Sequence, residues 1–199
     1  GSVAYTENAT PVVLDADALN VVAQNWPDGQ MLETETVLTP HPGEMARLLR
    51  TSTAQVQLSR MHAASALSKK FGCWVVLKGA RTVIAGPDGT LLVNPTAIPT
   101  LATAGSGDVL AGMIGSFLAR GFPARAATAC AVFVHGCAGE VGFIDNRGPI
   151  GTLAGDVLGY LPSVINALLS FHCPMPRRLR KVLPGSMHLL AQDVSDDAG

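Results

Sequence analysis

Short apolar runs without polar alternation mark three positions in the first half of the chain: Pro11–Leu14, Thr36–Thr39 and Trp74–Leu77. Such runs are typical of strands that a sheet buries on both faces. Two further runs, Thr82–Ala85 and Thr90–Val93, flank the sequence Gly-Pro-Asp-Gly, and this arrangement predicts a hairpin.

A helical pattern separates the second and third of these runs. A short helix is expected over about 44–49, and a longer one begins at a Thr53 cap and ends at Gly72. One face of the longer helix carries Val56, Arg60, Ala64, Leu67 and Phe71, with the methylene stem of Arg60 lying along it.

Helical periodicity dominates the second half of the chain. Long helices are predicted near 109–119 and 124–138, and two short helices meet at Pro162, the second ending near Ser170. Strands that alternate with helices imply an α/β layered fold with a mainly parallel central sheet flanked by helices.

Composition favours one folded domain and excludes some partners. Hydrophobic residues make up 48% of the 199 residues, the formal net charge is -1 and aromatic residues are 5%. No basic surface or base-stacking surface for nucleic acid follows from these values. The most apolar stretch, Ala126–Ile144, is interrupted by His135 and Glu140, so a buried helix is expected there and no membrane span.

Cysteine usage and the end of the chain add two expectations. Cys73, Cys130, Cys137 and Cys173 form no C-x-x-C pair, so we expect apolar core residues in a reduced, cytoplasmic setting and no protein metal site. From Pro174 the composition turns polar and charged. The predicted organisation is therefore one domain over 3–172 and a flexible polar tail over 173–199.

A glycine-rich turn before the helix at 109–119 is the strongest candidate for chemistry. Gly105 and Gly107 bracket Ser106, so backbone N–H groups and the helix start favour an anion such as phosphate. Asp108 at the same place is either a stabilising first-turn residue or a base that takes a proton from an attacking hydroxyl.

Two loops at predicted strand ends supply further candidates. His41 lies between Pro40 and Pro42, where α/β folds bind ligands, and Glu44 is a helix-start residue or a second ligand contact. Lys78 ends a strand and is followed by small residues, so it either reaches a nucleotide phosphate or is an ordinary surface lysine.

The motifs T-P-H-x-G-E, L-K-G-x-x-T and A-T-x-G-S-G-D-V-L-A-G, in this order and spacing, resemble the NAD(P)H-hydrate dehydratases. This family is a branch of the ribokinase-like superfamily, and the resemblance covers about residues 11–162. It implies repair of hydrated NADH and NADPH by ADP- or ATP-driven phosphorylation of the substrate hydroxyl and loss of phosphate.

The resemblance also implies roles for single residues. Asp108, the catalytic residue, would contact the hydrate together with His41 and Glu44. The residues that would line the nucleotide site are Lys78, Gly79, Ala80, Arg81, Thr82, Ala104, Gly105, Ser106 and Gly107. Mg²⁺ would accompany the nucleotide, held mostly by phosphate and water.

The chain departs from the family pattern in two ways. Ile98, Thr100 and Ala104 stand where the family has asparagine, glycine and glycine, which predicts weaker nucleotide binding. The family domain also begins well before Asp15, with a first strand and helix, so the fold is expected to be incomplete at its N-terminus. An exposed sheet edge would then make the protein a homo-oligomer.

Two other functions share these motifs. A vitamin or sugar kinase of the same superfamily would use Asp108 and the anion turn but release a stable phosphorylated product. A non-catalytic nucleotide-binding domain would keep the fold alone, and Ile98 favours this alternative.

Overall fold

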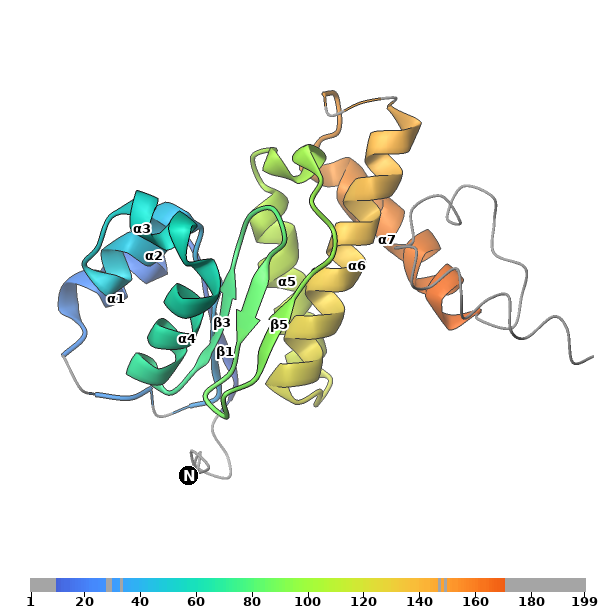
Figure 1. Ribbon diagram of the computed structural model, residues 1–199. Helices are drawn as coiled ribbons and strands as arrows, with labels where there is room; N and C mark the ends of the chain where they lie inside the picture. Colours follow the sequence, from blue (N-terminus) through green and yellow to red (C-terminus); the bar gives the residue numbers. More distant parts are fainter. Residues whose placement is uncertain (1–9, 28–29, 33, 147, 149, 171–199) are drawn as a thin grey trace, which may run out of the picture. The chain divides into compact units, whose positions relative to one another are not determined.

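The computed structural model describes residues 10–27, 30–32, 34–146, 148 and 150–170 (Figure 1). They belong to two compact units. The first unit contains the described residues up to Ala97 and Gly107–Val132, and the second contains Ile98–Ser106 and the described residues from Phe133 onward. One boundary between the units therefore falls inside the predicted anion turn, between Ser106 and Gly107.

The first unit is built on a mixed sheet of five strands in the order β1-β2-β3-β4-β5. Its strands are β1 (Val12–Leu14), β2 (Thr36–Leu38), β3 (Trp74–Leu77), β4 (Val83–Ala85) and β5 (Leu91–Val93). The first three run parallel, and β4 and β5 form the predicted antiparallel hairpin. The carboxyl ends of β1, β2 and β3 consequently meet at one edge of the sheet.

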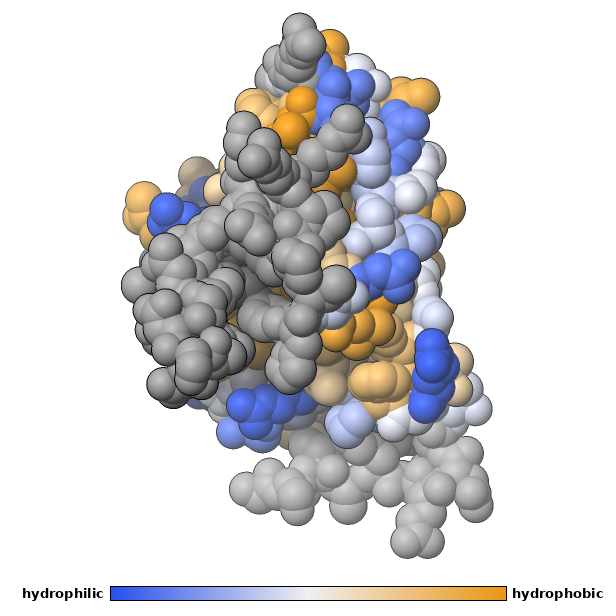
Figure 2. Space-filling view, turned by 90° about the vertical axis from the view of Figure 1, so that its right-hand side faces the viewer, coloured by the Kyte–Doolittle hydropathy of each residue, from blue (hydrophilic) through white to orange (hydrophobic). Residues whose placement is uncertain are grey.

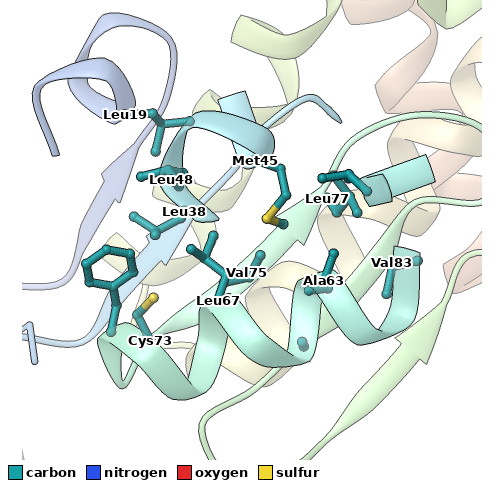
Figure 3. Packing of buried hydrophobic residues seen from close by; sticks show 14 of the residues in the cluster. Leu19, Leu38, Met45, Leu48, Ala63, Leu67, Cys73, Val75, Leu77 and Val83 are labelled. Atoms are coloured by element: carbon teal, nitrogen blue, oxygen red, sulfur yellow. The ribbon is translucent and has the colours of Figure 1, made fainter. Parts of the chain in front are cut away.

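Helices cover one face of this sheet and form the core shown in Figure 3. These helices are α1 (Asp17–Asn25), α2 (Pro42–Leu49), α3 (Thr53–Leu58) and α4 (Arg60–Phe71). Leu38, Val75 and Leu77 point from the strands into a cluster with Met45 and Leu67. Each of the five side chains is fully buried, which is where most of the stabilising apolar burial of this unit lies.

The opposite face of the sheet carries Val13, Val37 and Val76, because successive side chains of a strand alternate. Helix α5 (Ser106–Ala119) packs on this face, since a Cβ added to Gly115 would lie 4.0 Å from Cγ2 of Val13. Every residue of β2 and β3 is buried, which explains their apolar runs without alternation, whereas β1 is only partly buried, contrary to the expectation of a buried strand. β1 lies at the edge of the described sheet, and its Val12 is 37% exposed.

The predicted helix over 53–72 proves to be two helices. Ser59, with φ -139° and ψ 56°, separates α3 from α4, and the cap is Ser52, whose hydroxyl accepts from the N–H of Gln55. The expected ending at Gly72 is confirmed, with φ 65° in the left-handed region. The break makes Arg60 the first residue of α4, and its guanidinium leaves the expected face to bind carbonyls at the end of β3.

The second unit consists of a 3-10 turn η1 (Pro99–Ala102), the last part of α6 (Ala124–Asp145) and α7 (Ala154–Leu169). Helix α6 runs beyond the predicted end at 138, because its glycines serve close packing instead of ending the helix. A Cβ on Gly139 would lie 2.6 Å from Cγ of Leu101, and one on Gly142 would lie 2.9 Å from Cγ2 of Thr152.

Helix α7 contradicts the prediction of two short helices that meet at Pro162. The helix continues through this proline although Pro162 cannot donate a backbone hydrogen bond. A buried stripe on both sides of the proline, formed by Val157, Leu161, Val164 and Ala167, outweighs the local cost.

Two expectations about composition are also settled in part. Helix α6 is, among the described helices, the one long and apolar enough to cross a membrane, but 67% of its most apolar window is buried, as in a core helix. Cys73 and Cys137 are buried as expected, whereas Cys130 is exposed, contrary to the prediction of a core residue. Cys173 and the predicted tail lie outside the described residues.

Apolar and polar side chains are interspersed on the face of the molecule shown in Figure 2. In the second unit, the large apolar residues that are exposed are Ile150, Leu153, Leu158 and Leu169.

Candidate active site

Three side chains meet at the edge of the sheet where the parallel strands end. Lys78 follows β3 directly, Asp15 follows β1 and Glu44 lies in the first turn of α2 behind β2. The Nζ atom of Lys78 lies 2.6 Å from Oδ1 of Asp15 and 4.0 Å from Oε2 of Glu44. Each side chain is largely buried, so Lys78 is not an ordinary surface lysine. We call Asp15, Glu44 and Lys78 the acid–lysine trio.

The trio has a net charge of one negative unit when all three groups are ionised. Because two carboxylates lie against it, the Lys78 ammonium offers little attraction to an additional anion. Attraction for a phosphate at this edge must therefore come mainly from other groups, such as the start of a helix.

The start of α5 lies directly against the trio. A Cβ added to Gly107 would lie 3.2 Å from Nζ of Lys78 and 3.8 Å from Oδ2 of Asp15. A side chain at this position would press on the ammonium, so glycine allows the start of α5 to lie close to it. The first N–H groups of a helix have no partner within the helix, so this start brings backbone donors to the site.

Asp108 follows Gly107 in the first turn of α5 and is exposed. Among the described residues, no hydrogen bond or ion pair is formed by its carboxylate. The first-turn position is compatible with the stabilising role considered from the sequence. The absence of a partner within the described chain distinguishes Asp108 from Asp15 and Glu44, whose oxygens are engaged.

The T-P-H-P-G-E loop is a self-contained helix cap. His41 is the N-cap of α2, and its Nδ1 accepts from the N–H groups of Gly43, at 2.9 Å, and Glu44, at 3.4 Å. Glu44 returns the bond, because its Oε2 accepts from the N–H of His41 at 2.7 Å. Pro42 fits the first helical position, where no N–H is needed. Gly43 leaves room for the imidazole, since a Cβ there would lie 2.8 Å from Cε1 of His41.

This cap fixes the chemistry of the imidazole. Because Nδ1 accepts two bonds, the neutral ring carries its proton on Nε2. That nitrogen lies 3.5 Å from Oε1 of Glu44, and the side chain of His41 is 51% exposed. The Nε2–H group therefore faces Glu44, and a ligand at the sheet edge would compete with that carboxylate for it.

The loop Lys78–Thr82, which we call the nucleotide loop after the role that the sequence predicts for it, has an unusual backbone. Gly79 has φ 130° and Arg81 has φ 52°, a conformation that costs energy for a residue with a side chain. The N–H of Lys78 donates to the carbonyl of Pro40 at 2.8 Å, and the hydroxyl of Thr82 donates to the carbonyl of Gly79 at 3.0 Å. Ala80 and Arg81 are exposed.

The second unit holds the other half of the glycine turn. Ser106 is buried, and its hydroxyl lies 3.1 Å from Nε2 of His135 on α6. Burial lowers the pKa of His135 to about 4, so the imidazole is neutral at physiological pH. Gly105 has φ 83°, and a Cβ there would lie 3.1 Å from Cβ of Ala154. The Ser106 side chain thus faces the interior.

Comparison with known proteins decides the family of this chain. Residues 3–163 match the family described as NAD(P)H-hydrate dehydratase. The chain belongs to this family.

Similar proteins of known sequence and structure agree with this assignment. The ADP-dependent (S)-NAD(P)H-hydrate dehydratase of Neisseria meningitidis serogroup B is 45% identical over 150 residues, which are 74% of this chain and 50% of that protein. The crystal structure of the ADP/ATP-dependent NAD(P)H-hydrate dehydratase of Bacillus subtilis, co-crystallized with ATP/Mg²⁺, matches with TM-score 0.70 and 35% identity over 78% of this chain and 54% of that chain.

The fold is ribokinase-like, as the sequence predicts. A ribokinase-like superfamily protein of Enterococcus faecalis matches with TM-score 0.63 and 26% identity, over 77% of this chain and 52% of that chain. The chain thus spans about half the length of each of these three relatives.

For a member of the NAD(P)H-hydrate dehydratase family, the structure collects part of the predicted site. Lys78 and Gly107 lie together with the cap residue Glu44, while Ala104 and Gly105 belong to the second unit and stay predictions. Two candidates, Asp15 and Arg60, were not among the site residues predicted from the sequence. The signal for Asp15 was present, because an acidic residue directly follows a predicted strand.

Proposed function

We propose that this protein repairs hydrated NADH and NADPH by nucleotide-dependent dehydration, as a carbon–oxygen lyase that uses ADP or ATP. The observation that carries the proposal is the Asp108 carboxylate, which is exposed and has no partner among the described residues, beside the N-terminus of α5 and the Lys78–Gly107 contact. Family membership supports the substrate, since the relatives named above are dehydratases of NAD(P)H hydrates.

In the proposed reaction, Asp108 takes the proton of the substrate hydroxyl while its oxygen attacks the terminal phosphorus of the nucleotide. A new O–P bond forms and the bond to the shortened nucleotide breaks. Inorganic phosphate then leaves the carbon, a ring proton is lost, and the double bond of the reduced nicotinamide is restored. His41 is proposed to donate its Nε2–H, which lies 3.5 Å from Oε1 of Glu44, to the substrate.

The nucleotide is proposed to bind along Lys78–Thr82 and at Gly107, where the helix start favours phosphate. Glu44 is proposed as a substrate contact as well, although its oxygens already serve His41 and Lys78. In the structure, Glu44 therefore acts first as part of the cap, and direct contact with the hydrate stays a prediction.

Mg²⁺ is proposed to accompany the nucleotide. Among the described residues, no group of three or more His, Cys, Asp or Glu side chains is able to hold a metal ion. The carboxylates of Asp15 and Glu44 are suitable oxygen ligands in kind, but both face Lys78. The ion would thus be held chiefly by phosphate and water, and it would neutralise charge on the transferred group.

We further propose that the protein self-associates and is cytoplasmic. The edge position of β1 and the exposure of Val12 support self-association, because unpaired strand edges pair readily with other chains. Light scattering across a dilution series tests this point. The two buried free thiols, Cys73 and Cys137, are compatible with a reducing compartment, which fractionation of cells would test.

Incubation of the chain with hydrated NADH, ADP and Mg²⁺ tests the proposed function. The reduced-nicotinamide absorbance should return, with one phosphate released for each NADH formed. Consumption of ADP without this absorbance would instead indicate a kinase that makes a stable phosphorylated product. Binding of ADP without any consumption would indicate a non-catalytic nucleotide-binding domain.

A further inference from the structure

Arg60 reaches from the start of α4 to the end of β3. Its Nη2 donates to the carbonyl of Leu77 at 3.0 Å and to the carbonyl of Lys78 at 3.2 Å. Its Nη1 donates to Oε1 of Gln57 at 2.9 Å. One guanidinium therefore binds the last carbonyl of the strand and the first carbonyl of the nucleotide loop.

Stability of the fold does not account well for an arginine in this place. Arg60 is half-buried, its Nε is buried without an acceptor, and among the described residues no carboxylate pairs with it. Burial lowers the pKa of the Arg60 guanidinium, which reflects the cost of removing its charge from water. An unsatisfied buried donor also carries an energetic cost, so a use other than packing is expected.

The guanidinium lies directly under the loop. A Cβ added to Gly79 would lie 3.2 Å from Nη1 and 3.3 Å from Nη2 of Arg60, and φ of Gly79 is 130°. Glycine is thus required here for two reasons, the left-handed backbone and the closeness of the guanidinium. Arg60 and Gly79 fit together as one local arrangement.

The peptide geometry shows what this arrangement does. The C=O and N–H of a trans peptide point in opposite directions. The Leu77 carbonyl points to Arg60, and the N–H of Lys78 in the same peptide accordingly points away, to the carbonyl of Pro40. The Lys78 carbonyl also points to Arg60, so the N–H of Gly79 must point away from it. Among the described residues, this N–H has no acceptor.

We propose that Arg60 is the positioning residue of the nucleotide loop, and that it turns the N–H of Gly79 outward as a donor to a phosphate oxygen of the nucleotide. The inference rests on the proposed function, because it needs the loop to bind a nucleotide. Its positive charge adds attraction that Lys78, held by two carboxylates, does not supply.

Loss of the guanidinium should weaken nucleotide binding selectively. Arg60→Ala frees both carbonyls and the loop, so the dissociation constant for Mg-ADP should rise by about ten- to a hundredfold. The KM for ADP should rise in parallel, whereas the KM for hydrated NADH stays within about twofold of wild type. Arg60→Lys keeps the positive charge but lacks the forked donors of the guanidinium, so its affinity for Mg-ADP should lie between those of the wild type and Arg60→Ala.

The experiment is titration calorimetry of Mg-ADP into the full chain, combined with thermal unfolding and steady-state kinetics. Arg120→Ala is the matched control, because Arg120 is an exposed arginine just beyond α5, away from the loop in sequence. It should bind as wild type does. If Arg60→Ala does not fold, Arg60→Lys alone decides, with an expected loss of at least about threefold.

The outcomes separate this inference from the proposed function. A wild-type chain that binds no Mg-ADP overturns both. If the wild-type chain binds Mg-ADP and Arg60→Ala binds it with the same affinity, only the role of Arg60 is overturned. Where Arg60→Lys is the variant that folds, an unchanged affinity in Arg60→Lys has the same meaning. Equal losses of affinity for ADP and for the hydrate would also overturn it, because they indicate a general structural defect. Selective loss for the nucleotide, graded through Arg60→Lys, supports it.

Discussion

The T-P-H-P-G-E loop and the start of α5 are both rich in polar groups, yet they use them differently. In the loop, His41 and Glu44 bind each other's backbone, and Glu44 also faces Lys78. At the start of α5, Asp108 is exposed without a partner among the described residues. The polar groups of the first segment are largely used by its own fold, whereas the Asp108 carboxylate of the second has only the start of its helix to stabilise and is open to a ligand.

The two segments show that motif residues differ in whether their polar atoms already have partners in the fold. A residue whose polar atoms are all engaged is retained first for local structure, even when it lies at the ligand edge of a sheet. A residue with an unengaged charge at the same edge is the better candidate for chemistry. By this criterion Asp108 is a better candidate than Glu44. His41 lies between them, because its Nδ1 caps α2 while its Nε2 faces Glu44 on a side chain that is 51% exposed.

The largest expected effect is on turnover. Asp108→Asn should lower the rate by about 10²–10⁴-fold, because the amide cannot take the proton of the substrate hydroxyl. Mg-ADP affinity should stay near that of wild type, since the carboxylate does not help to bind phosphate. Rate assays and calorimetry on this variant check both statements. A variant with wild-type activity would remove Asp108 from the mechanism and erase the difference between the two segments.

An intermediate effect concerns the buried half of the glycine turn, where Ser106 bonds His135. The pKa of His135 is lowered to about 4 from 6.5, so between these pH values the unfolded chain takes up a proton that the folded chain resists. The contribution of the neutral His135 to stability is complete above pH 6.5 and is lost as the pH falls, by about 3 kcal/mol at pH 4.

Urea unfolding from pH 4 to 8 checks this expectation with His135→Gln, which does not titrate and should lose the acid-side decline. Glu140 on the same helix acts in the opposite direction, because burial raises its pKa to about 7 and stability falls as the pH rises from 4.5 to 7. Glu140→Gln is therefore the control for the neutral side. Parallel profiles for wild type and His135→Gln would contradict the buried neutral imidazole.

The smallest effect separates the two roles of His41. His41→Ala removes the cap and should lower the free energy of unfolding by about 1 kcal/mol. His41→Asn supplies another good cap and should restore most of that stability. Neither alanine nor asparagine has the imidazole Nε2–H group. If His41 contacts the substrate, activity should therefore stay low in both His41→Ala and His41→Asn. Recovery of activity together with stability in His41→Asn would show that His41 acts only as a cap.

Local sequence signals predicted much of the fold. Gly-Pro-Asp-Gly marked the hairpin between β4 and β5, and Gly72 marked the end of α4. The burial of β2 and β3 followed from runs without alternation, but the same pattern wrongly predicted a buried β1. One prediction was wrong because tertiary packing overrode a local rule: the buried stripe of α7 stabilises a helix that continues through Pro162. Another was wrong at Ser59, because the periodicity of the sequence did not indicate the break between α3 and α4.

Each motif of the sequence predicted single site residues, but not the contacts between residues of different motifs. Lys78 and the anion turn were proposed from their motifs and stay predictions as site residues. The pairing of Lys78 with Asp15 was not predicted, because it joins residues 63 positions apart that parallel strands bring together. The hydrogen bonds from Arg60 to the carbonyls of Leu77 and Lys78 were also not predicted. An arginine on an apolar helix face usually lays its methylene stem along that face. Cys130 is exposed because its side of α6 is not covered, which composition does not reveal.

According to this comparison, the Asp108 carboxylate serves a ligand and the Glu44 carboxylate serves the fold. Urea unfolding of Asp108→Ala and Glu44→Ala, measured side by side without substrate, tests this most directly. Glu44→Ala should lower the free energy of unfolding by about 1–3 kcal/mol, because the N–H of His41 and the ammonium of Lys78 each lose a partner. Asp108→Ala should cost less than about 1 kcal/mol, the value of a first-turn carboxylate at a helix start. An equal or larger loss for Asp108→Ala would contradict the account, because it would show that this carboxylate, too, serves the fold.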